Sequence, residues 1–416
     1  MKILLANKFY YLKGGTERHV FDLKNLLESK NHQVVPFSML DIRNFKSKYA
    51  EYFVSNVELE RPGFSFRDLK TASRIIYSFE AKKKIEALVK KVRPDIVHIH
   101  NIYHQISPSI LTVLKKCNIP IVQTLHDYKL ICPAYILYSK GEICERCKRY
   151  RYYMCTLRKC TKNSRSASFI NTIEMYFHKF LKIYENNVDV FVAPSNFLRD
   201  KILEWGILKP EQIVTIPHFI DLSRYALNRQ IETEAKSNQY FLYFGRFSKE
   251  KGLTDLISAM NYVKKGRLLF AGEGPEEKKL KEQVRQRDLS NVEFLGHLDQ
   301  KELIQVIAKS LFTILPSVVY ESFGLTILES YALGKPVIGS DSGAIPELIE
   351  DQKTGLIFQA GNSRDLVEKI NFMMKNKDKV LEMGRRARFK VEREFTSARY
   401  YEKLMEVYQE VVKYQK

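Results

Sequence analysis

The segment Glu321–Glu329 reads ESFGLTILE and continues as SYALGKPVIGSDSGAIPELI. An apolar run before it, Leu311–Leu315, predicts a strand, and residues Ser322–Leu333 predict a helix that ends at Gly334. Free backbone N–H groups at a helix start carry partial positive charge, and a glycine there lets a ligand approach the backbone closely. The segment therefore predicts an α/β protein with a binding site at this strand-to-helix turn.

Two carboxylates enclose the turn. Glu321 lies at the expected helix entrance, and Glu329 follows eight residues later. At about 100° per residue the two side chains fall on roughly one face, so both can contact one extended ligand. The alternative is a pair of solvated glutamates on a surface helix. The N–H groups expected to face the ligand are those of Ser322, Phe323, Gly324 and Leu325.

The spacing of these glutamates resembles the EX7E signature of the retaining glycosyltransferases of family 4, whose members have the two-domain GT-B fold. The resemblance covers nearly the whole chain, from an opening strand, glycine-pair loop and first helix in residues 1–38. The segment Ile216–Tyr225 is similar to the interdomain segment, although His218 and Phe219 replace the usual Asn-Gly, which affects the local turn. Further matches in the expected order are Phe241–Gly252 (FLYFGRFSKEKG), Leu268–Pro275 (LLFAGEGP) and the pair Thr354 and Gly355.

This resemblance implies a GT-B architecture, with two Rossmann-like doubly wound α/β domains facing across a deep cleft. Apolar runs that alternate with amphipathic helical stretches independently indicate parallel sheets flanked by helices. We expect an N-terminal acceptor-side domain over residues 1–217, with a Cys-rich insert at about 128–165, and a C-terminal nucleotide-sugar-binding domain over 218–395. A helix over 396–416 should cross back to the first domain. The clearest strand-like runs are Ile96–Ile99, Ile119–Leu125, Val188–Ala193, Tyr240–Phe244 and Arg267–Phe270.

Two cations flank the loop that follows the run Tyr240–Phe244, namely Arg246 and Lys251. Loss of a nucleoside diphosphate from a sugar builds negative charge on the terminal phosphate, and fixed cations stabilise that charge without a metal. A solvated turn is the alternative. By resemblance, Arg246 and Lys251 bind the diphosphate, Glu329 holds the ribose hydroxyls and Glu321 positions the transferred sugar. Backbone contacts to the donor are expected at Phe323, Gly324 and Leu325.

Residues of the N-terminal half complete the expected site. Gly14 and Gly15 lie in a strand-to-helix turn, and the resemblance assigns Gly15 to the donor phosphates. His126 follows the run Ile119–Leu125, at a strand end where doubly wound sheets place ligand-binding residues. In the family a histidine at this position lies beside the transferred sugar and the acceptor. His126 is therefore expected to act as a catalytic or orienting residue through a neutral imidazole.

Two further histidines, His98 and His100, close the preceding strand in the sequence DIVHIHN. A lone histidine in a strand is more often a packed polar residue than a catalyst. We interpret His98 as structural and expect it on the sheet face opposite His100.

Five of the six cysteines fall within 29 residues, which indicates a local cause. Stable disulfides are disfavoured in a cytoplasmic protein, whereas a C-x2-C pair with two further thiolates has a suitable spacing for a tetrahedral structural zinc ion. Ordinary free thiols are the alternative, because the intervals do not follow a standard zinc-finger pattern. The insert follows His126 directly, so we expect it to shape the acceptor pocket. The expected zinc ligands are Cys132, Cys144, Cys147 and Cys160.

The formal net charge of +20 and the pI near 9.4 indicate an acidic partner. Basic residues and tyrosines are interleaved in the insert. A solvated basic face, contact with an anionic membrane surface and binding of nucleic acid are the interpretations, in decreasing order of preference. No apolar run is long enough to span a bilayer, and no signal peptide is recognised, so we expect a cytoplasmic protein, free or peripheral at the inner face of the membrane.

The resemblance implies transfer of a sugar, with its anomeric configuration retained, from a UDP- or GDP-type nucleoside-diphosphate sugar to an acceptor hydroxyl. The acceptor is expected to be a glycan or lipid-linked glycan in cell-surface polysaccharide or glycolipid assembly, and no metal or cofactor is expected in catalysis. The alternative is a non-catalytic GT-B subunit that binds a glycan or a membrane. An epimerase or a phosphorylase on the same architecture is a third hypothesis.

Overall fold

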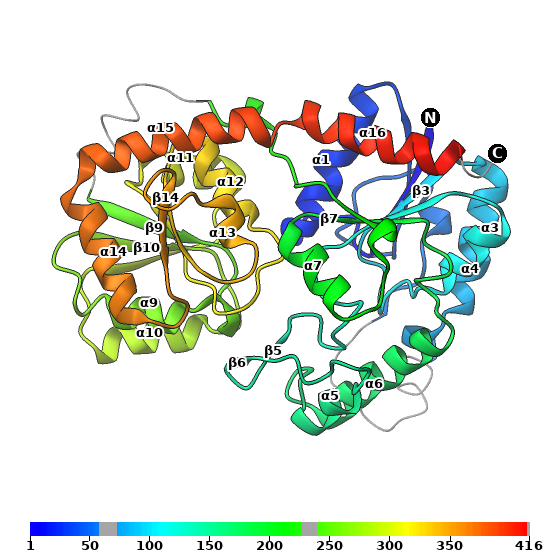
Figure 1. The fold of residues 1–416 in the computed structure, drawn as a ribbon, viewed down its shortest axis with the longest axis horizontal. Helices are drawn as coiled ribbons and strands as arrows, with labels where there is room; N and C mark the ends of the chain where they lie inside the picture. The colour runs from blue at the N-terminus through cyan, green and yellow to red at the C-terminus, as the bar shows by residue number, and fades with distance from the viewer. Residues whose placement is uncertain (58–72, 227–238, 414–416) are drawn as a thin grey trace. The chain divides into compact units, whose positions relative to one another are not determined.

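The structure is a computed structural model that describes residues 1–57, 73–226 and 239–413. The chain forms two compact units (Figure 1). The first unit contains residues 1–140, 144–217 and 400–416, and the second contains residues 141–143 and 218–399. The roles expected for the two domains stay predictions.

A six-stranded parallel sheet forms the centre of the first unit, in the order β2-β1-β3-β4-β7-β8. Its strands are β1 (Lys2–Ala6), β2 (Gln33–Phe37), β3 (Ile96–Ile99), β4 (Ile121–Thr124), β7 (Val190–Ala193) and β8 (Ile213–Thr215). The described helices that lie wholly in this unit are α1 (Gly15–Ser29), α3 (Phe79–Val92), α4 (Ser109–Lys116), α5 (Tyr153–Arg158), α6 (Arg165–Phe180) and α7 (Asn196–Glu204). Two short strands, β5 (Tyr138–Ser139) and β6 (Glu142–Ile143), precede α5.

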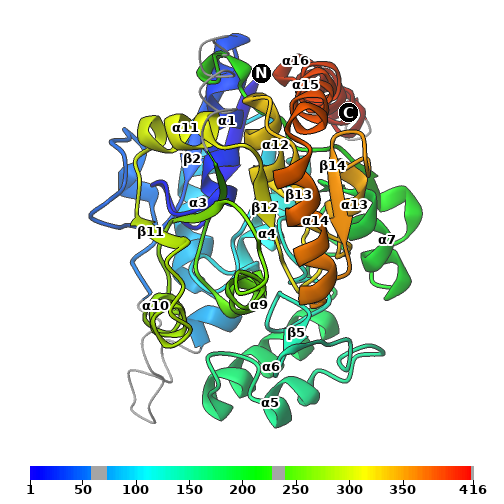
Figure 2. The same ribbon diagram turned by 90° about the vertical axis from the view of Figure 1, so that its left-hand side faces the viewer.

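The second unit also has a six-stranded parallel sheet, in the order β11-β10-β9-β12-β13-β14 (Figure 2). Its strands are β9 (Tyr240–Phe244), β10 (Arg267–Ala271), β11 (Val292–Gly296), β12 (Thr313–Leu315), β13 (Val337–Ser340) and β14 (Gly355–Phe358). Its helices are α9 (Leu253–Ala259), α10 (Glu277–Gln286), α11 (Gln300–Lys309), α12 (Leu325–Ala332), α13 (Ile345–Leu348), α14 (Ser363–Lys375) and α15 (Lys377–Glu394).

Strand β9 shows why these sheets could be read from the sequence. All five of its residues are buried. Phe241 and Tyr243 lie in the core formed with α9, α10 and α14, whereas Tyr240, Leu242 and Phe244 lie in the core formed with α11, α12 and α13. A strand covered on both faces must be apolar at every position, and this is typical of parallel sheets between helices. The predicted parallel sheets flanked by helices are confirmed.

Each sheet has a point where the strand order reverses direction, between β1 and β3 in the first unit and between β9 and β12 in the second. The connections leave the sheet on opposite sides there, and doubly wound proteins bind ligands at the carboxyl ends of the strands beside such a point.

The last helix, α16 (Ser397–Lys413), belongs to the first unit from Tyr400 onward. Its buried side chains recur three or four residues apart and form one face. They are Tyr400, Leu404, Val407, Tyr408 and Val411.

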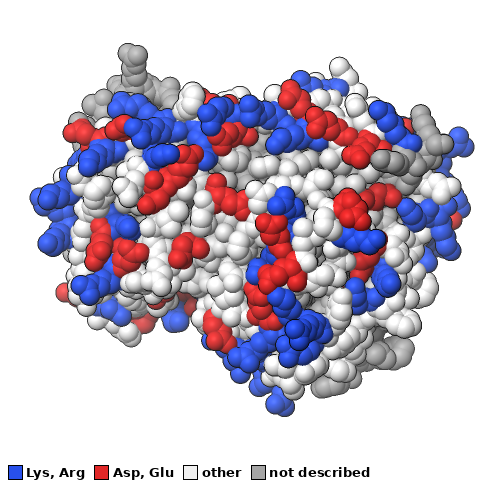
Figure 3. Space-filling view, in the orientation of Figure 1, with Lys and Arg blue, Asp and Glu red and all other residues white. Residues whose placement is uncertain are grey.

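Two features of the protein are relevant to contact with a membrane: the length of its apolar helices and the position of its surface charges. In the part of the chain that the structure describes, no helix combines the length and the low polarity needed to cross a bilayer. On the face drawn in Figure 3, Lys and Arg side chains gather at the lower edge of the molecule, over the segment that leads to α5.

Candidate functional site

Two loops meet beside β9 and β12 in the second unit. The first follows β9 and ends at Gly252, where α9 begins, and the second contains Pro316 and Ser317 after β12. A Cβ atom at Gly252 would lie 2.0 Å from the carbonyl oxygen of Pro316, and the φ angle of Gly252 is +68°. Both the close approach and the left-handed backbone require glycine. The two loops are thus fixed against each other at the point where the strand order reverses.

An ion pair joins these loops. The Lys251 ammonium lies 2.6 Å from the Oε1 atom of Glu321, and the Ser317 hydroxyl donates a hydrogen bond to the same oxygen. Burial raises the pKa of Glu321, but the charge and hydrogen bond of Lys251 and the Ser317 hydrogen bond outweigh it, so the net pKa is below its ordinary value. The carboxylate is therefore ionised at neutral pH.

The second expected cation, Arg246, is exposed in the loop after β9. Its carbonyl oxygen accepts a hydrogen bond of 2.9 Å from the Tyr243 hydroxyl, which fixes the backbone of the loop while the guanidinium group faces solvent.

The expected helix start at Ser322 is wrong. Helix α12 begins at Leu325, because Gly324 has a φ angle of +118° and cannot continue a right-handed helix. Phe323 and Gly324 therefore lie in the turn before the helix, and the N–H groups of its first turn begin at Leu325. Glu321 lies outside the helix, so the argument that placed both glutamates on one helix face is also wrong.

Phe323 and Glu329 point into the protein. The Phe323 ring is buried and lies 5.1 Å from the ring of His218, between centroids. Glu329 is buried on α12, and its Oε1 atom accepts a hydrogen bond of 3.4 Å from the Tyr225 hydroxyl. Tyr225 was not expected from the sequence; it ends the segment that resembles the interdomain region.

In the first unit, His126 follows β4 and contacts the end of β3. Its Nε2 atom lies 2.8 Å from the Nδ1 atom of His100. Burial lowers the pKa of His126 far below its usual value, and the nearby His19, His98 and Lys8 lower it further. The imidazole is therefore neutral at physiological pH.

The expectation that His98 lies on the sheet face opposite His100 is wrong. Its ring stacks on that of His100 at 4.5 Å between centroids, because residues two apart on a strand share one face. The ring is fully buried between two hydroxyl groups, 2.6 Å from that of Tyr408 on α16 and 2.7 Å from that of Thr124. Burial lowers the pKa of His98 to about 3, so it stays neutral.

A small cavity of about 10 Å³ lies beside His126. This volume is about that of one water-sized sphere. Asp127 and Lys129 contribute to its wall, and burial raises the pKa of Asp127. Lys8, which follows β1, is close enough to Asp127 for its positive charge to lower the pKa of the Asp127 carboxyl. Burial lowers the pKa of Lys8 itself. Lys8 was missed in the sequence, although its place directly after a strand is the signal that singled out His126.

Gly15 is the exposed first residue of α1. The Oε1 atom of Glu17 in the first turn accepts a hydrogen bond of 3.4 Å from the Asn7 amide, and burial raises the pKa of Glu17. This helix start therefore lies close to the end of β1, at the switch point of the first sheet.

Comparison with known proteins decides the family. A model of Glycosyltransferase Family 4 matches residues 13–224, just over half of the 416 residues, and a model of Glycosyl transferases group 1 matches residues 225–390. The chain belongs to glycosyltransferase family 4. The family expected from the sequence is confirmed, and the protein is a glycosyltransferase.

Similar proteins and solved structures cover most of the length of this family 4 glycosyltransferase. An uncharacterized 42.6 kDa protein of a cps region in Klebsiella pneumoniae is 28% identical over 84% of this chain and 87% of its own. The solved sucrose-phosphate synthase of Thermosynechococcus elongatus has a TM-score of 0.74 at 18% identity, over 99% and 98% of the two chains. The solved HepE protein of Anabaena, in complex with UDP and glucose, has a TM-score of 0.68 at 18% identity, over 98% and 99%. The GT-B fold is confirmed.

The structure of this family 4 member gives no support for the expected zinc site. All six are free thiols, and the described residues include no set of three or more His, Cys, Asp or Glu side chains placed to hold a metal ion. Cys132 and Cys147 are buried, whereas Cys144 and Cys160 are half-buried. Burial raises the pKa of Cys132 to about 11, so this thiol is protonated at neutral pH. The zinc ligands remain a prediction without support in the structure.

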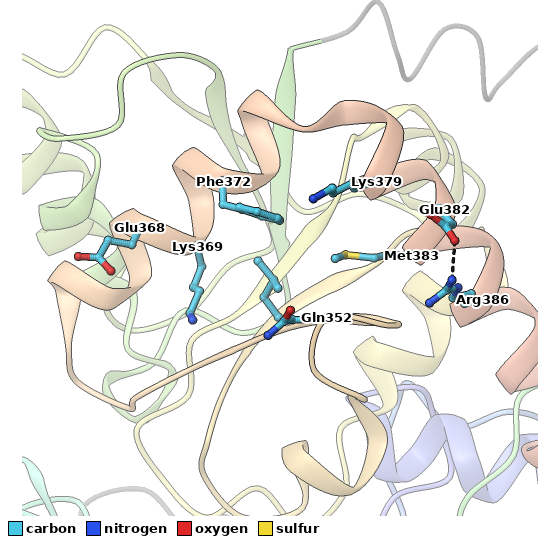
Figure 4. Close-up of a pocket in the computed structure, with 9 residues that line it drawn as sticks. Gln352, Glu368, Lys369, Phe372, Lys379, Glu382, Met383 and Arg386 are labelled. Carbon is cyan, nitrogen blue, oxygen red and sulfur yellow. Dashed lines mark hydrogen bonds and ion pairs between the residues drawn. The ribbon is translucent and has the colours of Figure 1, made fainter.

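A pocket of about 500 Å³ lies elsewhere in the second unit (Figure 4). Side chains of α14 and α15 and the segment around β14 line it, and Glu382 and Arg386 form an ion pair at one side. Its lining contains none of the residues expected to bind the donor. Its described lining residues are Gln352, Leu356, Glu368, Lys369, Phe372, Lys379, Glu382, Met383 and Arg386.

Proposed function

We propose that this glycosyltransferase moves a sugar from a nucleoside-diphosphate sugar to an acceptor hydroxyl with retention of the anomeric configuration. The observation that carries the proposal is the Lys251–Glu321 ion pair where the strand order of the second sheet reverses. A half-buried ionised carboxylate beside a cation can stabilise positive charge on a sugar ring while the cation stabilises the departing phosphate.

The other donor contacts are proposed on the same basis. Arg246 and Lys251 bind the diphosphate as it leaves, which provides a path that needs no metal. The backbone of Phe323, Gly324 and Leu325 and the loop at Gly15 contact the donor. Glu329, held by Tyr225, binds the ribose hydroxyls.

His126 is proposed as the group that orients the transferred sugar or shuttles the acceptor proton. Its low pKa supports the orienting role, because a neutral imidazole can accept one hydrogen bond and donate another, whereas a proton shuttle works best with a pKa near the working pH. The hydrogen bond to His100 fixes the ring that would do so.

A UDP-sugar is the donor we propose first, and a GDP-sugar second. The solved HepE structure, which holds UDP and glucose, supports this order through the shared fold. We propose a glycan or lipid-linked glycan as the acceptor, in polysaccharide or glycolipid assembly, and a peripheral position at an anionic membrane as the location.

Thermal unfolding with UDP, GDP, ADP and their sugars tests the donor site, because a ligand that binds only the folded state stabilises it by about 2.7 kcal/mol at a hundredfold excess over Kd. We expect one nucleotide to raise the Tm and Arg246→Ala to remove the shift. Arg364→Ala, on an α14 side chain that is 93% exposed, should keep it. A Tm that responds to none of the nucleotides would instead favour a non-catalytic binding subunit.

Glu321→Gln tests the chemistry. With the matching sugar donor and glycan acceptors, this variant should release no nucleoside diphosphate and still show the nucleotide-induced Tm shift. Turnover at the native rate would refute the role of Glu321.

A further inference from the structure

Helix α6 places its aromatic side chains on the outside. Five apolar residues of this helix are exposed, by 37% to 84%, and their spacing of four, three, one and three residues puts them on one face. They are Phe169, Ile173, Tyr176, Phe177 and Phe180.

The inner face of α6 is largely polar, and several of its side chains hydrogen-bond or pair with the rest of the unit. Glu174 is 0% exposed and pairs with the Lys129 ammonium at 2.6 Å. The Nε2 atom of His178 lies 2.8 Å from a backbone carbonyl oxygen, and the Asn171 amide donates to another at 3.2 Å. Thr172 also donates to a backbone carbonyl oxygen. Since hydrogen bonds and an ion pair attach the helix to the unit, its aromatic face is not needed for the core.

The exposed aromatic surface extends beyond α6. The Phe177 ring lies 6.1 Å from that of Tyr77, which in turn lies 5.4 Å from that of Phe79 at the start of α3. Phe79 is 77% exposed. A contiguous exposed apolar surface of this kind marks an interaction site. We call the five α6 side chains together with Tyr77 and Phe79 the α6 apolar surface.

The chain around this surface is strongly basic. Residues 146–182 contain ten Lys and Arg residues and a single acid, Glu174, which is buried in its ion pair. The exposed cations of this segment include Arg149, Arg151, Lys159, Arg165 and Lys182. Charge complementarity therefore calls for an anionic partner.

A second copy of the chain does not suit this surface. A two-fold dimer brings the same patch of both protomers together, so basic residues would face basic residues. An anionic bilayer offers both parts of the match: its headgroups attract Lys and Arg, and its interface accepts aromatic rings. Building on the peripheral location proposed above, we propose that the α6 apolar surface docks on an anionic membrane, with the rings at the headgroup boundary and the cations on the phosphates.

Sedimentation with vesicles of phosphatidylcholine alone, and of phosphatidylcholine mixed with phosphatidylglycerol, tests this proposal. The protein should bind the anionic vesicles in preference, and salt should weaken the binding. Phe169→Ser with Phe180→Ser should weaken it at least about tenfold, since each ring removes apolar area from water. Phe389→Ser, on an α15 ring that is 62% exposed, is the matched control and should bind like the native protein.

Reversal of charge gives a second, independent variant. Arg165→Glu with Lys182→Glu should weaken binding to anionic vesicles at least about tenfold, because each cation near such a surface contributes about 1 kcal/mol. Lys279→Glu, at a side chain on α10 that is 64% exposed, should leave it unchanged.

The outcomes separate this proposal from its competitors and from the donor site. Equal binding to neutral and anionic vesicles, or native binding by both double variants, would overturn it. A native dimer that the Phe169→Ser, Phe180→Ser variant splits would assign the surface to self-association instead. All variants should keep the native Tm and its nucleotide response, so loss of vesicle binding alone reports on the surface.

Discussion

Glu174→Gln should destabilise the first unit, because it removes one charge of a buried pair. The Lys129 and Glu174 side chains are 5% and 0% exposed, and their charged atoms lie 2.6 Å apart. Loss of one partner leaves the other charge buried without compensation, which costs about 3–5 kcal/mol. The glutamine oxygen still accepts a hydrogen bond from Lys129, so we expect the lower end, about 3 kcal/mol.

Urea unfolding of Glu174→Gln, Lys129→Met and the double variant measures this coupling. Removal of both charges should cost less than the sum of the single changes, with a coupling of about 2 kcal/mol. Native stability of Glu174→Gln, or strict additivity of the two changes, would refute the reasoning. Asp200→Asn, at a side chain that is 61% exposed on α7, is the control and should change the free energy of unfolding by less than about 0.5 kcal/mol.

The same pair predicts a pH dependence. Burial raises the pKa of Glu174, but Lys129 and His104 outweigh it and hold the pKa far below its ordinary value. A depressed pKa means that the stabilisation is complete above the unfolded-state pKa, about 4.3, and is lost as the pH falls below it. The stability difference between native protein and Glu174→Gln should therefore be constant near neutral pH and shrink below about pH 4. A difference that persists undiminished in acid would contradict this sign.

Two further predictions concern the donor loops. Gly252→Ala should destabilise the second unit by more than about 2 kcal/mol in urea unfolding, because its Cβ would meet the Pro316 carbonyl oxygen. The control is Gly361→Ala, where the φ angle is +76° and the space is open, and it should cost about 1 kcal/mol. Equal losses of stability in the two variants would show that only backbone strain acts. Lys251→Met should raise the pKa of Glu321, since burial is then opposed by less charge, and should shift the acid limb of the transfer rate to higher pH; an unchanged limb in a pH series would refute the link.

Strands were predictable where burial dictates residue type. The run Tyr240–Phe244 coincides with β9, because both of its faces are covered by helices. The start of α12 could not be predicted from the sequence. The helical pattern of apolar residues begins before the backbone becomes helical, and the left-handed Gly324 sets the boundary. Glycine is compatible with both interpretations in a sequence.

The contact partners of the site residues were harder to predict from the sequence. The carboxylate of Glu321 meets Lys251, 70 residues earlier, and the ring of His98 meets Tyr408, 310 residues later. No local sequence pattern encodes such distant contacts. His126 could be predicted because it follows a strand, but the residues that surround it could not. The inverted face of α6 was also hidden, since an apolar stripe on a helix is usually taken to face the core.

The hydroxyl of Tyr408 that reaches His98 has a consequence for how the protein is made. The first unit contains residues 1–217 apart from 141–143, but it also needs residues from 400 onward. A ribosome builds the chain in order, so all strands of the first sheet emerge before α16, and the second unit is synthesised in between. During that interval His98 lacks its tyrosine, and the surface that α16 later covers stays open to chaperones and proteases. The first unit is therefore completed by a helix that is synthesised after the second unit.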